Sequence, residues 1–114
     1  MRSERMRRVD EAVREVLSAA LSEGLKDPRV GFVTVTDVKT TPDLRRARVY
    51  VSVLGDEAAR TASLDGLASA HGFLQGRLGR ELRMKRTPTL DFVYDDTIER
   101  ADRLTRLIDR PGTA

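Results

Sequence analysis

Apolar residues recur in the first part of the chain with the spacing of one helix face. These residues are Val9, Val13, Val16, Leu17, Ala20 and Leu21. Positions i, i+4, i+7 and i+8 lie on the same side of an α-helix and can face a core together. Gly24 suits the C-terminal cap, and Asp27-Pro28 closes the segment. The pattern therefore predicts a helix from about Val9, preceded by an arginine-rich N-terminal segment.

Two segments with the residue pattern of β-strands follow. Residues 30–38 are rich in β-branched and aromatic side chains, and residues 46–53 alternate apolar with polar positions. Thr41-Pro42-Asp43 between them has the residue types of a turn. Because the two segments are adjacent and their connection is short, we expect an antiparallel hairpin with one polar face.

The second half of the chain combines helical spacing with a third alternating segment. Helical periodicity begins near Asp56 and is interrupted at Ala70-His71-Gly72, which predicts two helices that meet at a kink. Thr87-Pro88 ends the second of these helices. Residues 90–94 alternate as a strand, and Asp95-Asp96-Thr97 then provides the cap of a final helix.

This order of elements predicts an α+β fold. Helix, strand, strand, helix, kink, helix and strand, plus a C-terminal helix, form a two-layer sandwich with helices to one side of a three-stranded sheet. The arrangement resembles a KH-type RNA-binding domain of type II, the variant in which a helix comes first. We expect one domain over residues 1–110 and a short tail over residues 111–114, because no repeat or linker interrupts the pattern.

Composition excludes several classes of protein. The chain has no cysteine and one histidine, which rules out disulfides, thiol catalysis and cysteine-ligated zinc. No run of about 18 apolar residues could span a membrane, and the N-terminus lacks the apolar stretch of a secretion signal. We therefore expect a soluble, cytoplasmic monomer without a cofactor or a membrane partner.

Positive charge is concentrated in two blocks, although the net charge is only +3. The N-terminal block consists of Arg2, Arg5, Arg7 and Arg8. The second block consists of Arg77, Arg80, Arg83, Lys85 and Arg86. The arginines of the second block recur at i, i+3 and i+6, so they lie on one side of a predicted helix, and the last two cations extend the patch into the next loop.

The two blocks predict a polyanionic partner, and RNA is the one that the fold favours. Four or five phosphate contacts would give a log–log salt slope of about −3 to −4.5 on a duplex. An ordinary solvated helix face is the alternative. Aromatic residues are only 4% of the chain, so binding through backbone charge and shape is favoured over base stacking on a sheet.

Residues that could carry chemistry have simpler explanations. His71 has no cysteine partner and lies beside the expected kink. Asp95 and Asp96 lie where a strand leads into a helix, a position at which carboxylates cap free amides. Gly76-Arg77-Leu78-Gly79 matches the GXXG clamp of KH domains, but it lies within a helical pattern, so the Ala70–Gly72 segment is the better junction. We predict no catalytic and no metal site.

Several segments together resemble the bacterial ribosome-binding factor A family, over nearly the whole chain. The most specific is the stretch from Lys26 to Val38, KDPRVGFVTVTDV. The others are Arg8 to Glu11, Pro42 to Arg45, Ala47 to Gly55, Ala70 to Leu74, Arg86 to Pro88, Leu90 to Phe92, and Tyr94 to Asp96. The family's type-II KH fold has an Ala-x-Gly kink in place of the GXXG clamp, which matches Ala70 and Gly72 here.

The resemblance implies a factor that binds the free small (30S) ribosomal subunit and its 16S rRNA. It implies support for late maturation and for processing of the 5′ end of the precursor rRNA, importance in the cold, and release before translation. Many members carry a longer basic tail than residues 111–114 provide, and Gly76 stands where a basic residue is expected.

Two other functions are compatible with the sequence. One is a protein-binding adaptor whose sheet edge or acidic second helix docks an assembly factor such as a GTPase. The other is a metal-dependent nuclease that uses Asp91, Asp95 and Asp96, for which the sequence offers no further support.

Overall fold

The first helix is longer than the apolar spacing predicts. The structure, a computed structural model, describes residues 1–108, and helix α1 spans Glu4–Glu23. Ser3 is its N-cap, with a side-chain oxygen that accepts a hydrogen bond from the backbone nitrogen of Met6 at 3.1 Å. Gly24, at φ 88°, ends the helix. The expectation that the N-terminal arginines precede the helix holds for Arg2 but was wrong for Arg5, Arg7 and Arg8, because Ser3 starts the helix earlier.

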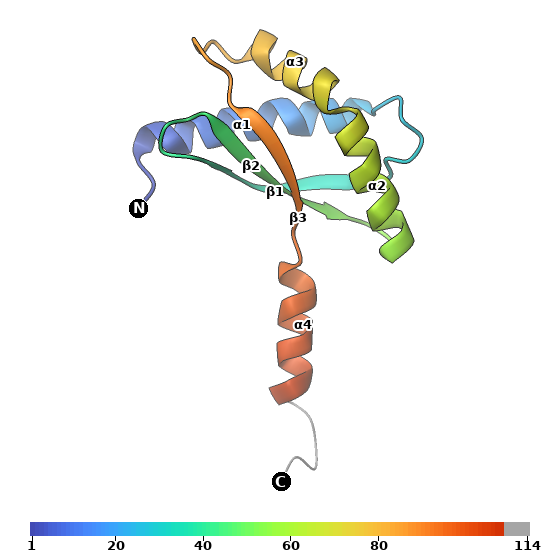
Figure 1. The fold of residues 1–114 in the computed structure, drawn as a ribbon. Coiled ribbons are helices and arrows are strands. Elements are labelled where there is room, and N and C mark those ends of the chain that lie inside the picture. The colour runs from blue at the N-terminus through green and yellow to red at the C-terminus, as the bar shows by residue number, and fades with distance from the viewer. Residues whose placement is uncertain (109–114) are drawn as a thin grey trace.

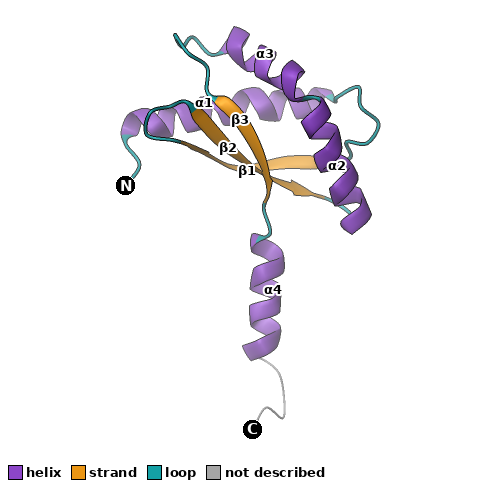
Figure 2. Cartoon of the chain, viewed as in Figure 1, coloured by secondary structure: helices purple, strands orange, loops and turns teal. Residues whose placement is uncertain are grey.

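The three strands form one mixed sheet in the order β1-β2-β3. Strand β1 (Val33–Thr40) pairs antiparallel with β2 (Arg46–Val53), which confirms the predicted hairpin. Strand β3 (Thr89–Tyr94) runs parallel to β2. A parallel partner requires a crossover connection, and the two helices between β2 and β3 provide it (Figure 2).

The crossover consists of helices α2 (Glu57–Ser69) and α3 (His71–Glu81), which meet at Ala70. Nε2 of His71 lies 2.9 Å from the carbonyl oxygen of Leu90, and the imidazole makes an edge-on contact with the ring of Phe92. The sole histidine therefore attaches the start of α3 to β3. Gly76-Arg77-Leu78-Gly79 lies inside α3 rather than in a loop between helices.

The core lies between the sheet and the three helices α1, α2 and α3, which cover one of its faces (Figure 1). Its largest fully buried side chains come from both layers and include Leu17, Leu67, Leu74, Leu78, Val49 and Leu90. These interactions confirm the predicted α+β sandwich of the KH-like type, because every element except the last contributes to a single apolar cluster.

Helix α4 (Thr97–Ile108) departs from this layer. It extends away from the end of β3, and none of its residues is buried (Figure 1). Its first turn is attached to the body: the hydroxyl of Tyr94 donates a hydrogen bond to Glu99, and the guanidinium of Arg60 in α2 lies 3.5 Å from the same carboxylate.

Two expectations, on the C-terminal tail and on membrane spans, are considered within the described residues 1–108. The predicted tail over residues 111–114 lies outside the described residues. Within residues 1–108, no helix has both the length and the apolar character needed to cross a lipid bilayer.

Candidate nucleic-acid interface

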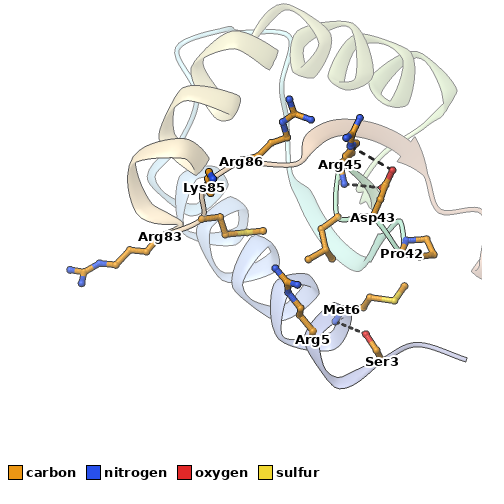
Figure 3. A pocket seen from close by; sticks show the side chains of 11 residues that line it. Ser3, Arg5, Met6, Pro42, Asp43, Arg45, Arg83, Lys85 and Arg86 are labelled. Carbon is orange, nitrogen blue, oxygen red and sulfur yellow. Dashed lines mark hydrogen bonds and ion pairs between the residues drawn. The ribbon is translucent and has the colours of Figure 1, made fainter.

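Three segments that are distant in the sequence meet beside the N-terminus of α1. They are the first turn of α1, the turn between β1 and β2, and the loop of residues 82–88 between α3 and β3 (Figure 3). Together they line a cleft of about 580 Å³, here called the basic cleft. Its lining residues are Ser3, Arg5, Met6, Pro42, Asp43, Leu44, Arg45, Arg83, Met84, Lys85 and Arg86.

The first turn of α1 is fixed to the sheet by a polar network. The guanidinium of Arg2 donates to both carboxylate oxygens of Asp10 at 2.8 Å, and also to the carbonyl oxygen of Thr40 at 2.9 Å. Asp10 in turn accepts hydrogen bonds from the backbone nitrogen and the hydroxyl of Thr40, both at 2.8 Å. Arg2 is thereby occupied within the fold, and the network holds Arg5 at the edge of the cleft.

The turn between β1 and β2 is held in an uncommon conformation. Leu44 has φ 59°, and it is the sole non-glycine residue of positive φ within residues 1–108. Its backbone nitrogen donates to the carbonyl oxygen of Thr41 at 2.8 Å. Asp43 accepts from the Thr41 hydroxyl at 2.6 Å and from the backbone nitrogen of Arg45 at 3.1 Å. These bonds fix the turn with the Leu44 side chain buried.

The loop of residues 82–88 is anchored at both ends. Leu82 is buried at the end of α3. At the other end, the side-chain amide of Gln75 donates to the carbonyl oxygen of Pro88 at 2.7 Å and accepts from the backbone nitrogen of Leu90 at 3.0 Å. The three cations between these anchors are therefore carried by a short, tethered segment.

Positive charge dominates the basic cleft, and most of it is free. Four lining cations are exposed and have no ion pair with any residue between 1 and 108: Arg5, Arg83, Lys85 and Arg86. Arg45 lies 3.9 Å from Asp43, the one acidic lining residue. The Thr41 hydroxyl and the Arg45 amide lower the pKa of Asp43. Asp43 is therefore an anion at neutral pH, outnumbered by its cationic neighbours.

The structure divides the cations that the sequence grouped on the α3 side. Arg83 is beyond the end of α3, and Figure 3 shows it pointing away from the other labelled side chains, at the outer edge of the cleft. Arg80 is exposed on α3 but does not line the cleft. Arg77 is turned toward α1 and is only 17% exposed.

Arg77 is engaged by two carboxylates. Its guanidinium donates to the two oxygens of Glu23 at 2.5 and 2.9 Å, and to Glu81 at 2.6 Å. These hydrogen bonds raise the pKa of Arg77 and lower the pKa of Glu23. Arg77 therefore joins the C-terminal ends of α1 and α3, and its charge is already compensated.

The N-terminal arginines also differ from one another. Arg5 lines the basic cleft, while Arg7 and Arg8 are exposed on other parts of α1 and do not line it. Arg8 pairs with Glu4 at 2.9 Å. Only one of the three predicted N-terminal contacts thus shares the cleft with the loop cations.

Sequence reasoning missed Arg45 and Arg46 as candidates. Both line a second hollow of about 660 Å³, which shares Pro42, Asp43, Arg45 and Arg86 with the basic cleft. Arg46 is paired with Asp91 at 2.7 Å, whereas Arg45 has only the distant contact with Asp43. Two consecutive arginines directly after a Pro-Asp turn were the available signal, because a turn projects its neighbours from the sheet.

The carboxylates proposed for a nuclease are used elsewhere. Asp91 pairs with Arg46, and Asp96 pairs with Arg100. Asp95 accepts from the Thr36 hydroxyl at 2.6 Å and caps α4 through the backbone nitrogen of Thr97, and these hydrogen bonds lower its pKa. Residues 1–108 contain no group of three or more acidic, histidine or cysteine side chains that could hold a metal ion.

Comparison with known proteins decides the family. The model of the family described as ribosome-binding factor A matches residues 5–108. Ribosome-binding factor A of Geobacter sulfurreducens is 46% identical over 104 residues, which cover 91% of this chain and 88% of the relative. The chain belongs to the ribosome-binding factor A family.

Solved structures agree with this assignment. The crystal structure of ribosome-binding factor A from Thermus thermophilus matches with a TM-score of 0.69 and 28% identity, over 78% of this chain and 93% of that one. A homology model of the Thermus thermophilus factor, fitted into an electron cryo-microscopy map of a 30S complex, matches with a TM-score of 0.60 and 28% identity, over 83% and 96%. The family is named for binding the ribosome, and Asp91, Asp95 and Asp96 each have a partner within the fold.

Proposed function

We propose that this protein binds the free small ribosomal subunit through its 16S rRNA, and that the basic cleft is the central contact. The observation that carries the proposal is the group of four unpaired cations, Arg5, Arg83, Lys85 and Arg86, which α1 and the loop of residues 82–88 bring to one cleft. Fixed cations without internal partners can neutralise phosphates and release counterions, which favours binding to nucleic acid. The relative from Thermus thermophilus, which has been fitted into a 30S complex, supports the choice of the small subunit.

The role requires binding energy but no turnover. A factor that binds one conformation of an immature subunit more tightly than another shifts the population toward it. We infer that the protein acts in this way as a cytoplasmic monomer late in small-subunit maturation and supports processing of the 5′ end of the precursor rRNA. Its loss would then matter most in the cold, when misfolded RNA rearranges slowly.

Helix α4 favours a protein partner in addition to RNA. Its apolar residues Ile98, Leu104, Leu107 and Ile108 are each at least 60% exposed. Exposed apolar patches on a small domain mark interaction sites. An adaptor role, with an assembly GTPase or another factor bound at α4, is therefore the second candidate function.

Sedimentation with purified small subunits tests the main proposal. We expect the protein to sediment with the subunits at about 50 mM salt and to be released strongly by about 200 mM, as for other binding based on phosphate contacts. The variant R5E/K85E/R86E should lose at least roughly 100-fold in affinity, because it places three anions against the RNA backbone. Binding by the folded variant at wild-type strength would contradict the proposal.

A matched control separates local charge from net charge. The variant R14E/K26E/K39E changes the net charge by the same amount at exposed positions that do not line the basic cleft. We expect it to retain most of the affinity for the small subunit. Nuclease treatment of a pull-down distinguishes the adaptor role, because partners bound at α4 would remain after the RNA is destroyed.

A further inference from the structure

The basic cleft has an apolar floor that backbone binding does not require. Met6 and Leu44 line it with exposures of 9% and 8%, and the half-buried Met84 and the ring of Pro42 complete the apolar part. Cations lie around this floor: Arg5 comes from α1, and Lys85 and Arg86 come from the loop of residues 82–88 (Figure 3). A concave site with an apolar base and charged edges suits a ligand that is itself part apolar and part anionic.

The shape of the cleft distinguishes between forms of RNA. Its volume of about 580 Å³ falls within the usual range for sites that enclose one small molecule. A regular duplex presents phosphates on a convex surface and keeps its bases stacked inside, so it has no apolar group to offer to the floor. An unpaired nucleotide turned out of the stack offers a base with a flat apolar face, attached to a phosphate.

The conformation of the turn agrees with a binding role for the floor. A leucine at positive φ costs free energy relative to a glycine or an asparagine at the same position, and such strain is concentrated at functional sites. Here the strained residue contributes its side chain to the floor, while the bonds between Thr41, Asp43 and Arg45 hold the turn in place. The strain thus maintains an apolar surface where a glycine would leave a gap.

We propose that the basic cleft binds a single unstacked nucleotide of the RNA. Its base lies on the floor formed by Met6, Leu44 and Met84, and its phosphate is held by cations from α1 and the loop of residues 82–88. This inference rests on the proposed RNA-binding function and specifies the form of RNA that the site takes.

Three RNA hairpins test the proposal with the full chain in a fluorescence anisotropy titration. The first carries one bulged nucleotide, the second carries an abasic residue at the bulge, and the third is fully paired. The abasic RNA keeps the phosphate, so it isolates the contribution of the base. We expect the first hairpin to bind about tenfold more tightly than the abasic one, from the usual contribution of one bound base. Equal affinities for the two bulged RNAs would overturn the inference.

A pair of leucine variants tests the floor directly. Asparagine tolerates positive φ, so L44N removes the apolar side chain without adding backbone strain. We expect L44N to bind both bulged RNAs equally, because the base has lost the apolar surface on which it lies. L54N is the matched control, because Leu54 is 76% exposed and outside the cleft, and it should keep the preference for the base. An L44N protein that keeps the tenfold preference would refute the role of the floor.

Two further measurements keep the outcome interpretable. If L44N does not fold, M84A shortens the floor from the loop side and is expected to reduce the preference severalfold. Sedimentation of the wild-type protein with small subunits is measured in parallel. Binding to subunits without any preference for a bulged base would leave the proposed function intact and reject this inference alone, whereas failure to bind subunits would reject the proposed function.

Discussion

The two ends of one basic stretch have opposite roles in this protein. At the start of the stretch, Arg77 is largely buried between two carboxylates and joins α3 to the end of α1. At its end, Lys85 and Arg86 are exposed beside the basic cleft and pair with no residue between 1 and 108. The side chains are of the same type, but only the second group has charge available for a ligand.

The difference follows from what lies opposite each segment. Arg77 faces Glu23, which the length of α1 brings to the same place, and Glu81 one helical turn away. The loop of residues 82–88 faces the first turn of α1 and the turn between β1 and β2, which add further cations. Like charges held near one another in the free protein repel, and a phosphate relieves that repulsion. A cluster of like charges that repel one another in the free protein therefore indicates a binding surface for a ligand of opposite charge.

The largest expected effect on binding comes from Lys85 and Arg86, the unpaired cations of the stretch. We predict that K85Q/R86Q weakens binding to small subunits by roughly tenfold or more, because two charge-assisted contacts with phosphates are lost. R77Q should change the affinity by less than about twofold, since its charge is already compensated. Sedimentation or filter binding at low salt measures both. Equal losses for the two variants would remove the distinction between the ends.

The largest expected effect on stability comes from Arg77, which is paired with two carboxylates. We predict that R77M lowers the melting temperature by several degrees, because it leaves Glu23 and Glu81 side by side without their shared cation. R86M should leave the melting temperature within about a degree, since no bond within residues 1–108 depends on it. Thermal unfolding followed by circular dichroism compares the two variants. A larger fall in melting temperature for R86M than for R77M would contradict the structural role of Arg77.

The salt dependence of binding to small subunits also distinguishes Arg86 from Arg77. Each phosphate contact that is removed should reduce the slope of log affinity against log salt by about one unit. We therefore expect R86Q to have a shallower slope than the wild type, and R77Q to have an unchanged one. The measurement is a titration at several salt concentrations on one preparation of small subunits. A shallower slope for R77Q would indicate that Arg77 leaves its carboxylates to contact RNA.

The smallest expected effect is a dependence of stability on pH. The hydrogen bond from Arg77 lowers the pKa of Glu23 below its ordinary value of 4.5. A carboxyl with a lowered pKa in the folded state contributes stability above its unfolded pKa and loses it as the pH falls through the folded value. From about pH 6 to about pH 3, the melting temperature should therefore fall more in the wild type than in R77M. The same fall in both proteins would show that the pair contributes nothing.

Much of the fold was predictable from local patterns. The strand alternation gave the hairpin, and the interruption at Ala70-His71-Gly72 indicated the point where α2 and α3 meet. The start of α1 was missed because its first turn carries two arginines and a single apolar residue, Met6, so Ser3 is the main local signal. The projection of α4 was also missed, because an apolar stripe predicts a buried face without specifying what covers it.

The sequence by itself determined the elements, the family and the presence of two blocks of positive charge, because periodicity, caps and motifs are local properties of the chain. Only the tertiary structure decided which of those charges are free. Arg77 meets Glu23, Arg2 meets Asp10 and Thr40, and Arg5 meets the loop of residues 82–88 through contacts between segments that lie far apart in the sequence. The physical reason is that a charge can bind a ligand only where the fold places no opposite charge beside it.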